Sequence, residues 1–349
     1  MSSERVINLA SDNAAPVAPE LMEALVKENA GPAMGYGNDD TTHRMEEKFK
    51  SLFDCDLKAY PVATGTAANV LALSVLTPPY GSVYCHELSH IQNDECGAPE
   101  FYTSGAKLCL LPGENGKLSS ELLHHRLENA GVGVVHHVQP SALSLTQVTE
   151  CGTIYTPSEV SALTEVAKSF KLGTHMDGAR FANAVEALGV APADVTWKAG
   201  IDVLSFGGTK NGAMAVEAVV FFDMDKAQEF EFRRKRGAHL FSKSRYLSAQ
   251  LDRYIEDDLW LRLAQTANGM AKRLAFGLSD LPGCTLLYPV EANMIFAILP
   301  EETIHALKSE GVLFYVMGPE ADGKVRLVTS WDTTEDDIDR FLEIVKNSA

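Results

Sequence analysis

Short apolar runs alternate with amphipathic stretches along most of the chain, and this alternation predicts its elements. The apolar runs predict strands at Lys58–Ala63, Ser82–Cys85, Lys107–Leu110, Val132–Gln139, Gly173–Met176, Val203–Phe206 and Val216–Phe222. The stretches between them predict helices at Pro19–Glu28, Thr42–Phe53, Ala67–Leu76, Ser119–Glu128, Pro157–Phe170 and Arg180–Leu188. Strands that alternate with helices are typical of an α/β fold with a mostly parallel sheet.

The rhythm changes near residue 247. A long helix is predicted at Leu251–Leu281, followed by strands at Asn293–Leu299, Val312–Met317 and Val325–Trp331 and a final amphipathic helix at Thr334–Lys346. We therefore expect two domains: a large α/β domain at residues 1–247, which includes an N-terminal arm, and a small C-terminal α+β domain at residues 248–349.

The charge narrows the range of partners. The chain has 30 basic and 47 acidic residues and a formal net charge of −17, so its surface repels nucleic-acid phosphates and anionic lipid. No apolar run approaches the roughly 20 residues that span a bilayer, and the N-terminal residues lack the pattern of a secretory signal. We expect a cytoplasmic protein that acts on a small molecule, with no nucleic-acid or membrane partner.

Metal chemistry has little support in the sequence. The six cysteines form no CxxC pair, and the ten histidines form no HExxH motif. We expect reduced thiols and no metal site.

Three junctions between a strand and the following helix carry candidate chemistry, because ligands of open α/β sheets bind where strands end. At the first, the strand before Thr64 runs into the small residues Gly65 and Thr66, which begin a helix. Free N–H groups at such a helix start can hold a phosphate. The alternative is an ordinary helix start.

The second junction contains Asp177 and Arg180 after an apolar strand. Asp177 is either a helix cap or a buried carboxylate that faces a cationic heterocycle. Arg180 could grip a substrate carboxylate with two hydrogen bonds.

The third junction places Lys210 at a strand end among glycines. Most lysines are simply exposed, but a desolvated lysine has a lowered pKa and can form a Schiff base with an aldehyde. A phosphate cradle, an acid for a ring nitrogen and a Schiff-base lysine together indicate pyridoxal 5′-phosphate. Their order along the chain is that of the aspartate-aminotransferase-like enzymes of fold type I.

At this point the sequence resembles the threonine aldolase family over nearly the whole chain. The matching segments are Leu9–Asn13, Tyr36–Asp39, Ala63–Asn69, His175–Arg180, Thr209–Gly212, Glu291–Asn293 and Val325–Val328. The segments Asp94–Phe101 and Thr196–Asp202 are most similar to the low-specificity and phenylserine aldolase branch.

The resemblance implies a role for each matched residue. Lys210 would hold pyridoxal 5′-phosphate covalently, and Asp177 would pair with its ring nitrogen. Gly65 and Thr66 would bind the phosphate, and His90 would stack on the ring and serve as a candidate base. Ser11, Arg180 and Arg326 would hold the substrate carboxylate. Tyr36 would lie near the site across a subunit interface, so the resemblance implies a dimer and favours a homotetramer.

The sequence departs from the family pattern in two places. Many threonine aldolases carry a second active-site histidine in a Glu-Asn-Thr-His segment, whereas Leu145–Glu150 contains none here. The base is therefore His90, a water that it orients, or another group. A neighbouring-subunit arginine that reaches the phosphate has no clean match either, and Lys243 lies in that region.

The reaction that the resemblance implies is cleavage of an L-β-hydroxy-α-amino acid, of the threonine, allo-threonine or phenylserine type, to glycine and an aldehyde. Two alternatives stay open at this stage. One is another reaction on the same cofactor: β-elimination, racemisation or transamination. The other is a phosphometabolite-binding α/β protein without catalytic activity, built on the turn at Gly65 and Thr66.

Overall fold

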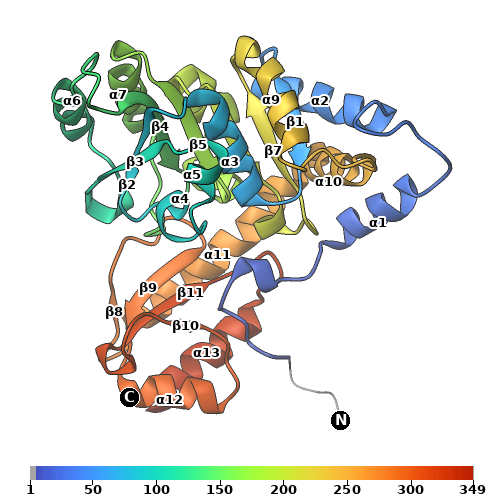
Figure 1. The fold of residues 1–349 in the computed structure, drawn as a ribbon. Coiled ribbons are helices and arrows are strands. Elements are labelled where there is room, and N and C mark those ends of the chain that lie inside the picture. Colours follow the sequence, from blue (N-terminus) through green and yellow to red (C-terminus); the bar gives the residue numbers. More distant parts are fainter. Residues whose placement is uncertain (1–4, 349) are drawn as a thin grey trace.

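The computed structural model describes residues 5–348, which form two sheets with their helices. Figure 1 shows the larger sheet with its helices above and the smaller sheet below, and the long helix α11 (Leu259–Ser279) runs between them. The prediction of a large domain with a mostly parallel sheet and a smaller α+β domain is confirmed. The boundary between residues 247 and 248 stays a prediction.

The large sheet has seven strands in the order β1-β7-β6-β5-β4-β2-β3. The strands are β1 (Lys58–Val62), β2 (Gly81–His86), β3 (Lys107–Leu111), β4 (Gln139–Thr146), β5 (Gly173–Gly178), β6 (Val203–Gly207) and β7 (Glu217–Phe221). The pairs among β3, β2, β4, β5 and β6 are parallel, whereas β7 runs antiparallel to both of its neighbours. The carboxyl ends of six strands and the start of β7 therefore meet at one edge.

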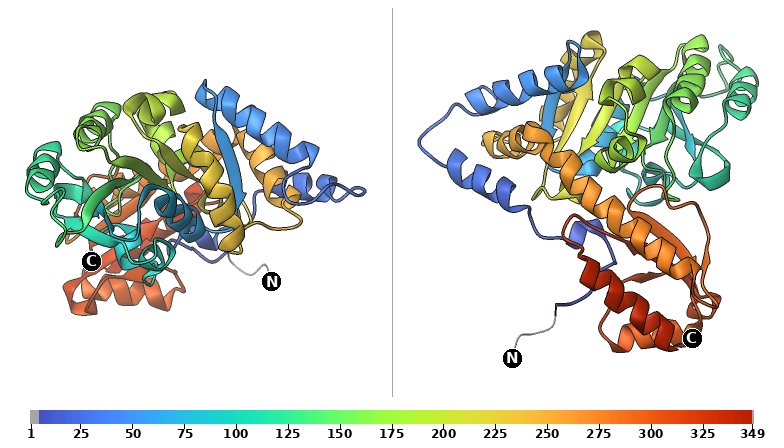
Figure 2. Two further views of the ribbon diagram at one scale, coloured as in Figure 1. Left: turned by 45° about the horizontal axis from the view of Figure 1, so that its top comes forward. Right: turned by 180° about the vertical axis from the view of Figure 1, so that it is seen from behind.

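Helices cover both faces of this sheet, as both views in Figure 2 show. The helices of this part of the chain are α1 (Pro19–Glu28), α2 (Asp40–Phe53), α3 (Gly65–Leu76), α4 (His90–Asn93), α5 (Ala98–Tyr102), α6 (Ser120–Glu128), α7 (Pro157–Ser169), α8 (Phe181–Leu188), α9 (Met224–Arg236) and α10 (Arg245–Ile255). Neighbouring strand residues point to opposite faces. Ala59 accordingly packs in the core with α2 and α10, and Tyr60 packs in the core with α3 and α9.

The small sheet is antiparallel in the order β10-β11-β9-β8. Its elements are β8 (Thr285–Leu286), β9 (Met294–Ile298), α12 (Glu301–Ser309), β10 (Tyr315–Val316), β11 (Lys324–Val328) and α13 (Glu335–Ser348). Apolar residues of α11, α12 and α13 bury one face of this sheet. The N-terminal segment joins this part of the molecule, because the N–H of Val328 donates to the carbonyl of Leu9.

One predicted strand is wrong. Residues 132–138 form a loop, and the strand β4 starts at Gln139 and continues to Thr146. Gly131 and Gly133 have positive φ, which breaks an extended path. Val135 is 93% exposed, so these valines do not form a core strand despite their β-propensity.

The helix predicted at Leu251–Leu281 is two helices. The chain leaves α10 at Ile255 and enters α11 at Leu259, because Asp257 and Asp258 adopt the left-handed conformation. The helix α9 was not predicted, because its exposed face is rich in charge and its last turn carries four basic residues.

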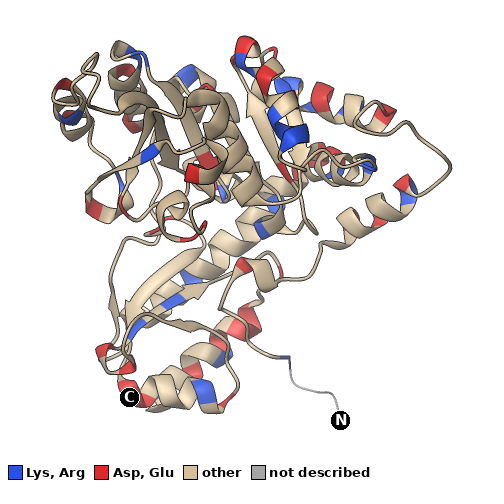
Figure 3. Ribbon diagram, viewed as in Figure 1, with Lys and Arg blue, Asp and Glu red and all other residues tan. Residues whose placement is uncertain are grey.

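Acidic and basic residues are mixed over the outer helices (Figure 3). The last turn of α9 differs, because it carries four basic residues in a row. Among residues 5–348, no helix is both long and apolar enough to cross a membrane.

Candidate active site

The strand ends of the large sheet surround one cavity of about 260 Å³. Of the predicted site residues, the structure brings together Gly65, Thr66, His90, Asp177, Arg180 and Lys210 on its wall. They come from four separate segments, each of which ends or follows one of the strands β1, β2, β5 and β6. The predicted site residues Ser11, Tyr36 and Arg326 do not line this cavity.

The start of α3 forms the phosphate-binding candidate. The hydroxyl of Thr64 accepts a hydrogen bond from the N–H of Ala67 at 3.1 Å. The N–H groups of Gly65 and Thr66 lie in the first turn, where a helix supplies no acceptor. Space is open above the Cα of Gly65, so a ligand anion could approach these donors and the positive end of the helix dipole.

Asp177 is fixed by two donors at the end of β5. Its Oδ2 accepts from the Asn69 side-chain amide at 2.8 Å, and its Oδ1 accepts from the N–H of Ala179 at 3.0 Å. The same amide of Asn69 donates to Oε1 of Glu95 at 3.0 Å. The carboxylate is buried, 4% exposed, and is therefore oriented before any ligand binds.

His90 begins α4 and extends this hydrogen-bond chain. Its Nδ1 lies 2.8 Å from Oε1 of Glu95, which leaves Nε2 as the nitrogen that can face a ligand. The hydrogen bond to Glu95 raises the pKa of His90 above its ordinary value, although burial opposes this effect. Burial raises the pKa of Glu95 in turn.

Lys210 lies on the short 3₁₀ helix Thr209–Asn211, which the surrounding core holds in place. The side chain of Asn211 donates to the hydroxyl of Tyr254 at 2.6 Å and to the carbonyl of Trp260 at 2.8 Å. Just before this turn, a Cβ on Gly207 would lie 2.3 Å from the carbonyl oxygen of Ala179, so only glycine fits there.

Arg180 is committed to a carboxylate of this chain. Its Nε and Nη2 donate to the two oxygens of Asp12 at 2.6 and 2.9 Å, and Asn293 donates to Asp12 at 3.0 Å. Burial alone would raise the pKa of Asp12, but Arg180 and Lys210 bring it below its ordinary value. The guanidinium of Arg180 therefore lines the cavity in an orientation that its two hydrogen bonds to Asp12 fix.

Arg326 and Ser11 lie beside the cavity instead of on its wall. The guanidinium of Arg326 lies 4.8 Å from the ring of Tyr315 and donates to the carbonyl of Ala10 at 3.1 Å. Its buried Nε has no hydrogen-bond partner among residues 5–348. Ser11 caps the turn Asp12–Ala14 by accepting from the N–H of Asn13, and Asn13 itself lines the cavity.

Tyr36 lies away from the cavity. Its side chain is 51% exposed, and its N–H donates to the carbonyl of Ser242 at 3.0 Å. The ammonium of Lys235 lies 5.0 Å from its ring centroid. A single chain therefore does not bring Tyr36 to its own site.

Two carboxyl groups in the cavity wall were missed by the sequence analysis. Glu217 begins β7, accepts from the N–H of Gly208 at 2.7 Å, and has its pKa raised to about 7, mainly by burial. Glu150 follows β4, and burial together with Asp177 raises its pKa. Glu217 could have been found from an isolated acidic residue in an apolar strand, and Glu150 from its place in the segment that departs from the family pattern.

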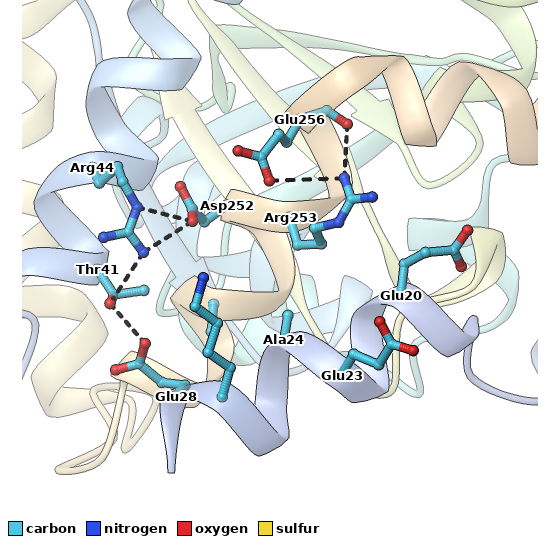
Figure 4. Close-up of a pocket in the computed structure, with 11 residues that line it drawn as sticks. Glu20, Glu23, Ala24, Glu28, Thr41, Arg44, Asp252, Arg253 and Glu256 are labelled. Carbon is cyan, nitrogen blue, oxygen red and sulfur yellow. Dashed lines mark hydrogen bonds and ion pairs between the residues drawn. The ribbon is translucent and has the colours of Figure 1, made fainter. Parts of the chain in front are cut away.

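A second cavity, of about 580 Å³, lies between α1, α2 and α10 and contains none of the predicted site residues (Figure 4). Several of its charges pair with one another: Arg44 contacts Asp252 at 3.0 Å, and Arg253 contacts Glu256 at 3.8 Å. No group of His, Cys, Asp and Glu within residues 5–348 has an arrangement that could hold a metal ion. The strand-end cavity is therefore the candidate active site.

Comparison with known proteins shows to which family this chain belongs. The family model described as beta-eliminating lyase matches residues 8–302. The chain belongs to the beta-eliminating lyase family. Within this family it is 43% identical to the low specificity L-threonine aldolase of Pseudomonas aeruginosa, over 97% of this chain and 96% of that protein. A relative of the same name from a Pseudomonas species is 43% identical over 93% of each chain.

Solved structures agree with this assignment for the beta-eliminating lyase. The threonine aldolase of Leishmania major has a TM-score of 0.91 and 28% identity, over 97% of this chain and 98% of that one. A NifS-like protein from Rickettsia africae has a TM-score of 0.70 at 13% identity, over 98% of this chain and 99% of that one, and shares the fold. The predicted fold type I and the resemblance to threonine aldolases are confirmed.

Proposed function

We propose that this protein is a pyridoxal-phosphate-dependent aldolase, a carbon–carbon lyase that cleaves L-β-hydroxy-α-amino acids to glycine and an aldehyde. The observation that carries the proposal is the meeting of Lys210, Asp177 and the start of α3 in one cavity. The identity to low specificity L-threonine aldolases supports the choice of threonine, allo-threonine and phenylserine as substrates.

The donor set of the cavity fits pyridoxal 5′-phosphate. The N–H groups of Gly65 and Thr66 in the first turn of α3 suit the phosphate. The fixed carboxylate of Asp177 suits a protonated ring nitrogen, and the amine of Lys210 suits the aldehyde. When bound, this cofactor withdraws the electrons of the bond that breaks. The role of the chain is to bind, to orient and to move protons.

We assign the substrate carboxylate to Arg180 and Arg326. Arg180 reaches the cavity while Asp12 holds two of its N–H groups, so its orientation is fixed before binding. The buried Nε of Arg326 has no hydrogen-bond partner in the described part of the chain, residues 5–348, and its guanidinium lies over the ring of Tyr315. Two arginines that hold one carboxylate limit the rotation of the amino acid, and such positioning lowers the barrier to cleavage.

The β-hydroxyl must lose a proton for the C–C bond to break. His90 is one group that can take it, because Nδ1 is engaged by Glu95 and Nε2 is left for the ligand side. Its raised pKa makes it a stronger base than a free histidine.

We also propose that the chain assembles as a homotetramer, a dimer of dimers with the sites at subunit interfaces, and that it works in the cytoplasm. Three exposed apolar side chains in adjoining segments, Met34, Tyr36 and Phe241, support an interface, because a patch of this kind on a lone chain is a docking surface.

The nearest rival is β-elimination on the same cofactor, which the description of the matching family favours. Products separate the two reactions. The cofactor-loaded protein is mixed with L-threonine, L-allo-threonine and L-phenylserine, and the products are identified. Glycine and the matching aldehyde in equal amounts support the aldolase. A 2-oxo acid with ammonia in their place would support elimination and overturn the proposal.

A further inference from the structure

A third cavity adjoins the active site and shares one wall residue with it. This cavity has a volume of about 400 Å³ and lies between the two sheets. We call it the side-chain chamber. Among residues 5–348, Glu150 is the single residue that lines both the active-site cavity and the chamber. The two cavities are therefore adjacent, with Glu150 between them.

Most of the chamber wall is apolar. Its apolar and aromatic members are Leu88, Cys151, Leu287, Tyr288, Phe296, Met317 and Val325. The rings of Tyr288 and Phe296 meet edge to face at 5.5 Å, which builds an aromatic corner. The rest of the wall is polar and consists of Asn93, Asp94, Glu150, Lys324 and Arg326. A pocket that apolar side chains line for the most part, with polar groups that fix orientation, is typical of a small-molecule subsite.

The residues that line the active-site cavity indicate which part of a substrate would enter the chamber. The groups that would hold the cofactor already surround its roughly 260 Å³, and Arg326, which we assign to the substrate carboxylate, borders the chamber. With the carboxylate held there, a β-substituent has the neighbouring chamber as its apolar space. A methyl group leaves most of this volume empty, whereas an aromatic ring contacts the walls.

Glu150 stands between the two cavities. No hydrogen bond to its side chain is formed within residues 5–348, although Asp177, Lys210, Arg180 and His90 all act on it electrostatically. It belongs to the segment Leu145–Glu150, in which this chain lacks the histidine of the threonine aldolase pattern. A carboxyl without a partner at this point can accept a hydrogen bond from a ligand hydroxyl.

We propose that the side-chain chamber receives the β-substituent of the substrate and favours aromatic β-substituents, with Glu150 at its entrance as the acceptor for the β-hydroxyl. This inference rests on the proposed aldolase function and names the part of the site that selects among its substrates. Leu88, Met317 and the aromatic corner are specificity-determining residues, and Glu150 positions the hydroxyl.

The test of the chamber uses binding and not turnover. L-Phenylalanine and L-alanine lack a β-hydroxyl and cannot undergo the cleavage, so their dissociation constants are measured from the absorbance change of the cofactor-loaded protein. Leu88→Trp and Met317→Trp narrow the chamber from two different segments, and both side chains are 43% exposed, which makes the folded protein tolerant of them. Leu313→Trp, at an exposed leucine outside the chamber, is the matched control.

We expect both chamber variants to bind L-phenylalanine roughly tenfold or more weakly than the unaltered protein does. Their affinity for L-alanine should stay within about twofold, because only the ring of L-phenylalanine needs the space. The control binds both amino acids as the unaltered protein does. Equal changes in the two dissociation constants, or no change in that of L-phenylalanine, would contradict the proposed role of the chamber. If the unaltered protein binds neither amino acid, the proposed function itself fails.

Glu150→Leu tests the hydroxyl contact, because leucine is of similar length but has no hydrogen-bond acceptor. We expect turnover of L-threonine and of L-phenylserine to fall by a similar factor of roughly 100, the scale of a misplaced reacting group. Binding of L-alanine and L-phenylalanine should stay within about twofold, since neither carries the hydroxyl. A parallel loss of L-alanine binding would mean that Glu150 only supports the cavity, and turnover equal to that of the unaltered protein would exclude the contact.

Discussion

At the scale of single residues, the site is built from polar groups that hold one another in place. His90, Glu95, Asn69 and Asp177 form one hydrogen-bond chain with steps of 2.8 to 3.0 Å. Each member fixes the next, so the carboxylate of Asp177 cannot rotate away from the cavity without breaking buried bonds. Orientation before binding is what lets such groups act strongly on a reacting molecule.

Asp177→Asn tests the charge of this carboxylate. We expect the variant to lose roughly 100-fold or more in turnover, because an amide keeps the shape but cannot stabilise a protonated ring nitrogen. Turnover of the cofactor-loaded protein with L-threonine is the measurement. Asp202→Asn is the control, since Asp202 accepts from the N–H of Thr174 at the opposite end of β5. Full turnover by Asp177→Asn would contradict the assigned role.

Glu217 gives a prediction about pH and stability. Burial raises its pKa from 4.5 to about 7, so the folded chain holds this proton more tightly than the unfolded chain. The free energy of unfolding therefore falls as pH rises from 4.5 to 7, by a contribution on the order of 3 kcal/mol.

Urea unfolding of the cofactor-free Glu217→Gln variant at pH 5 and pH 8 measures this contribution. Relative to the unaltered protein, the variant should gain stability between the two pH values, because its amide does not ionise. His175 acts in the opposite sense, since burial lowers its pKa to about 4 and stability is lost as pH falls from 6.5. The comparison between variant and unaltered protein cancels that effect. A pH-independent difference would refute the buried ionisation of Glu217.

At the scale of elements, alternating apolar and amphipathic segments predicted most of the large sheet, and strand ends pointed to Gly65, Asp177 and Lys210. The failures had local causes. Residues 132–138 look like a strand by composition, but they form a loop, because Gly131 and Gly133 have positive φ. Ser11 and Arg326 fall beside the cavity, since their positions depend on how the N-terminal segment pairs with the small sheet, which short-range patterns do not encode.

Substitution of two glycines by alanine distinguishes the effect of close packing from that of helix propensity. Gly207→Ala should destabilise the protein by roughly 2 kcal/mol or more, because the new Cβ would lie 2.3 Å from the carbonyl oxygen of Ala179, and β5 and β6 would have to separate. Gly269→Ala lies on the exposed side of α11 with open space around it, and should stabilise by up to about 1 kcal/mol. Thermal unfolding midpoints measure both. Equal effects of the two substitutions would show that β6 does not need the close approach.

At the scale of the whole molecule, one subunit is an incomplete unit under the proposed assembly. Tyr36 lies outside its own cavity, and it shares an exposed apolar patch with Met34 and Phe241, which are 70% and 41% exposed. The sequence resemblance implied an interface role for Tyr36, and the position of its segment against Ser242 is compatible with that role.

We expect the protein to sediment as a tetramer in analytical ultracentrifugation. A double variant, Met34→Asp with Phe241→Asp, should shift it to smaller species, because charges placed in an apolar interface lose their hydration. Phe276→Asp is the control, since Phe276 is 74% exposed on α11 and remote from this patch in the sequence. A monomeric unaltered protein, or a double variant that still sediments as a tetramer, would refute an interface at this patch.

The central claim is that Lys210 holds pyridoxal phosphate at the strand-end cavity. The most direct measurement is reduction of the cofactor-loaded protein with borohydride, which makes the bond between cofactor and lysine permanent, followed by digestion and mass spectrometry of the peptides. We expect the added mass on Lys210, in the peptide that contains Thr209–Gly212. The same mass on a different lysine, or on none, would contradict it.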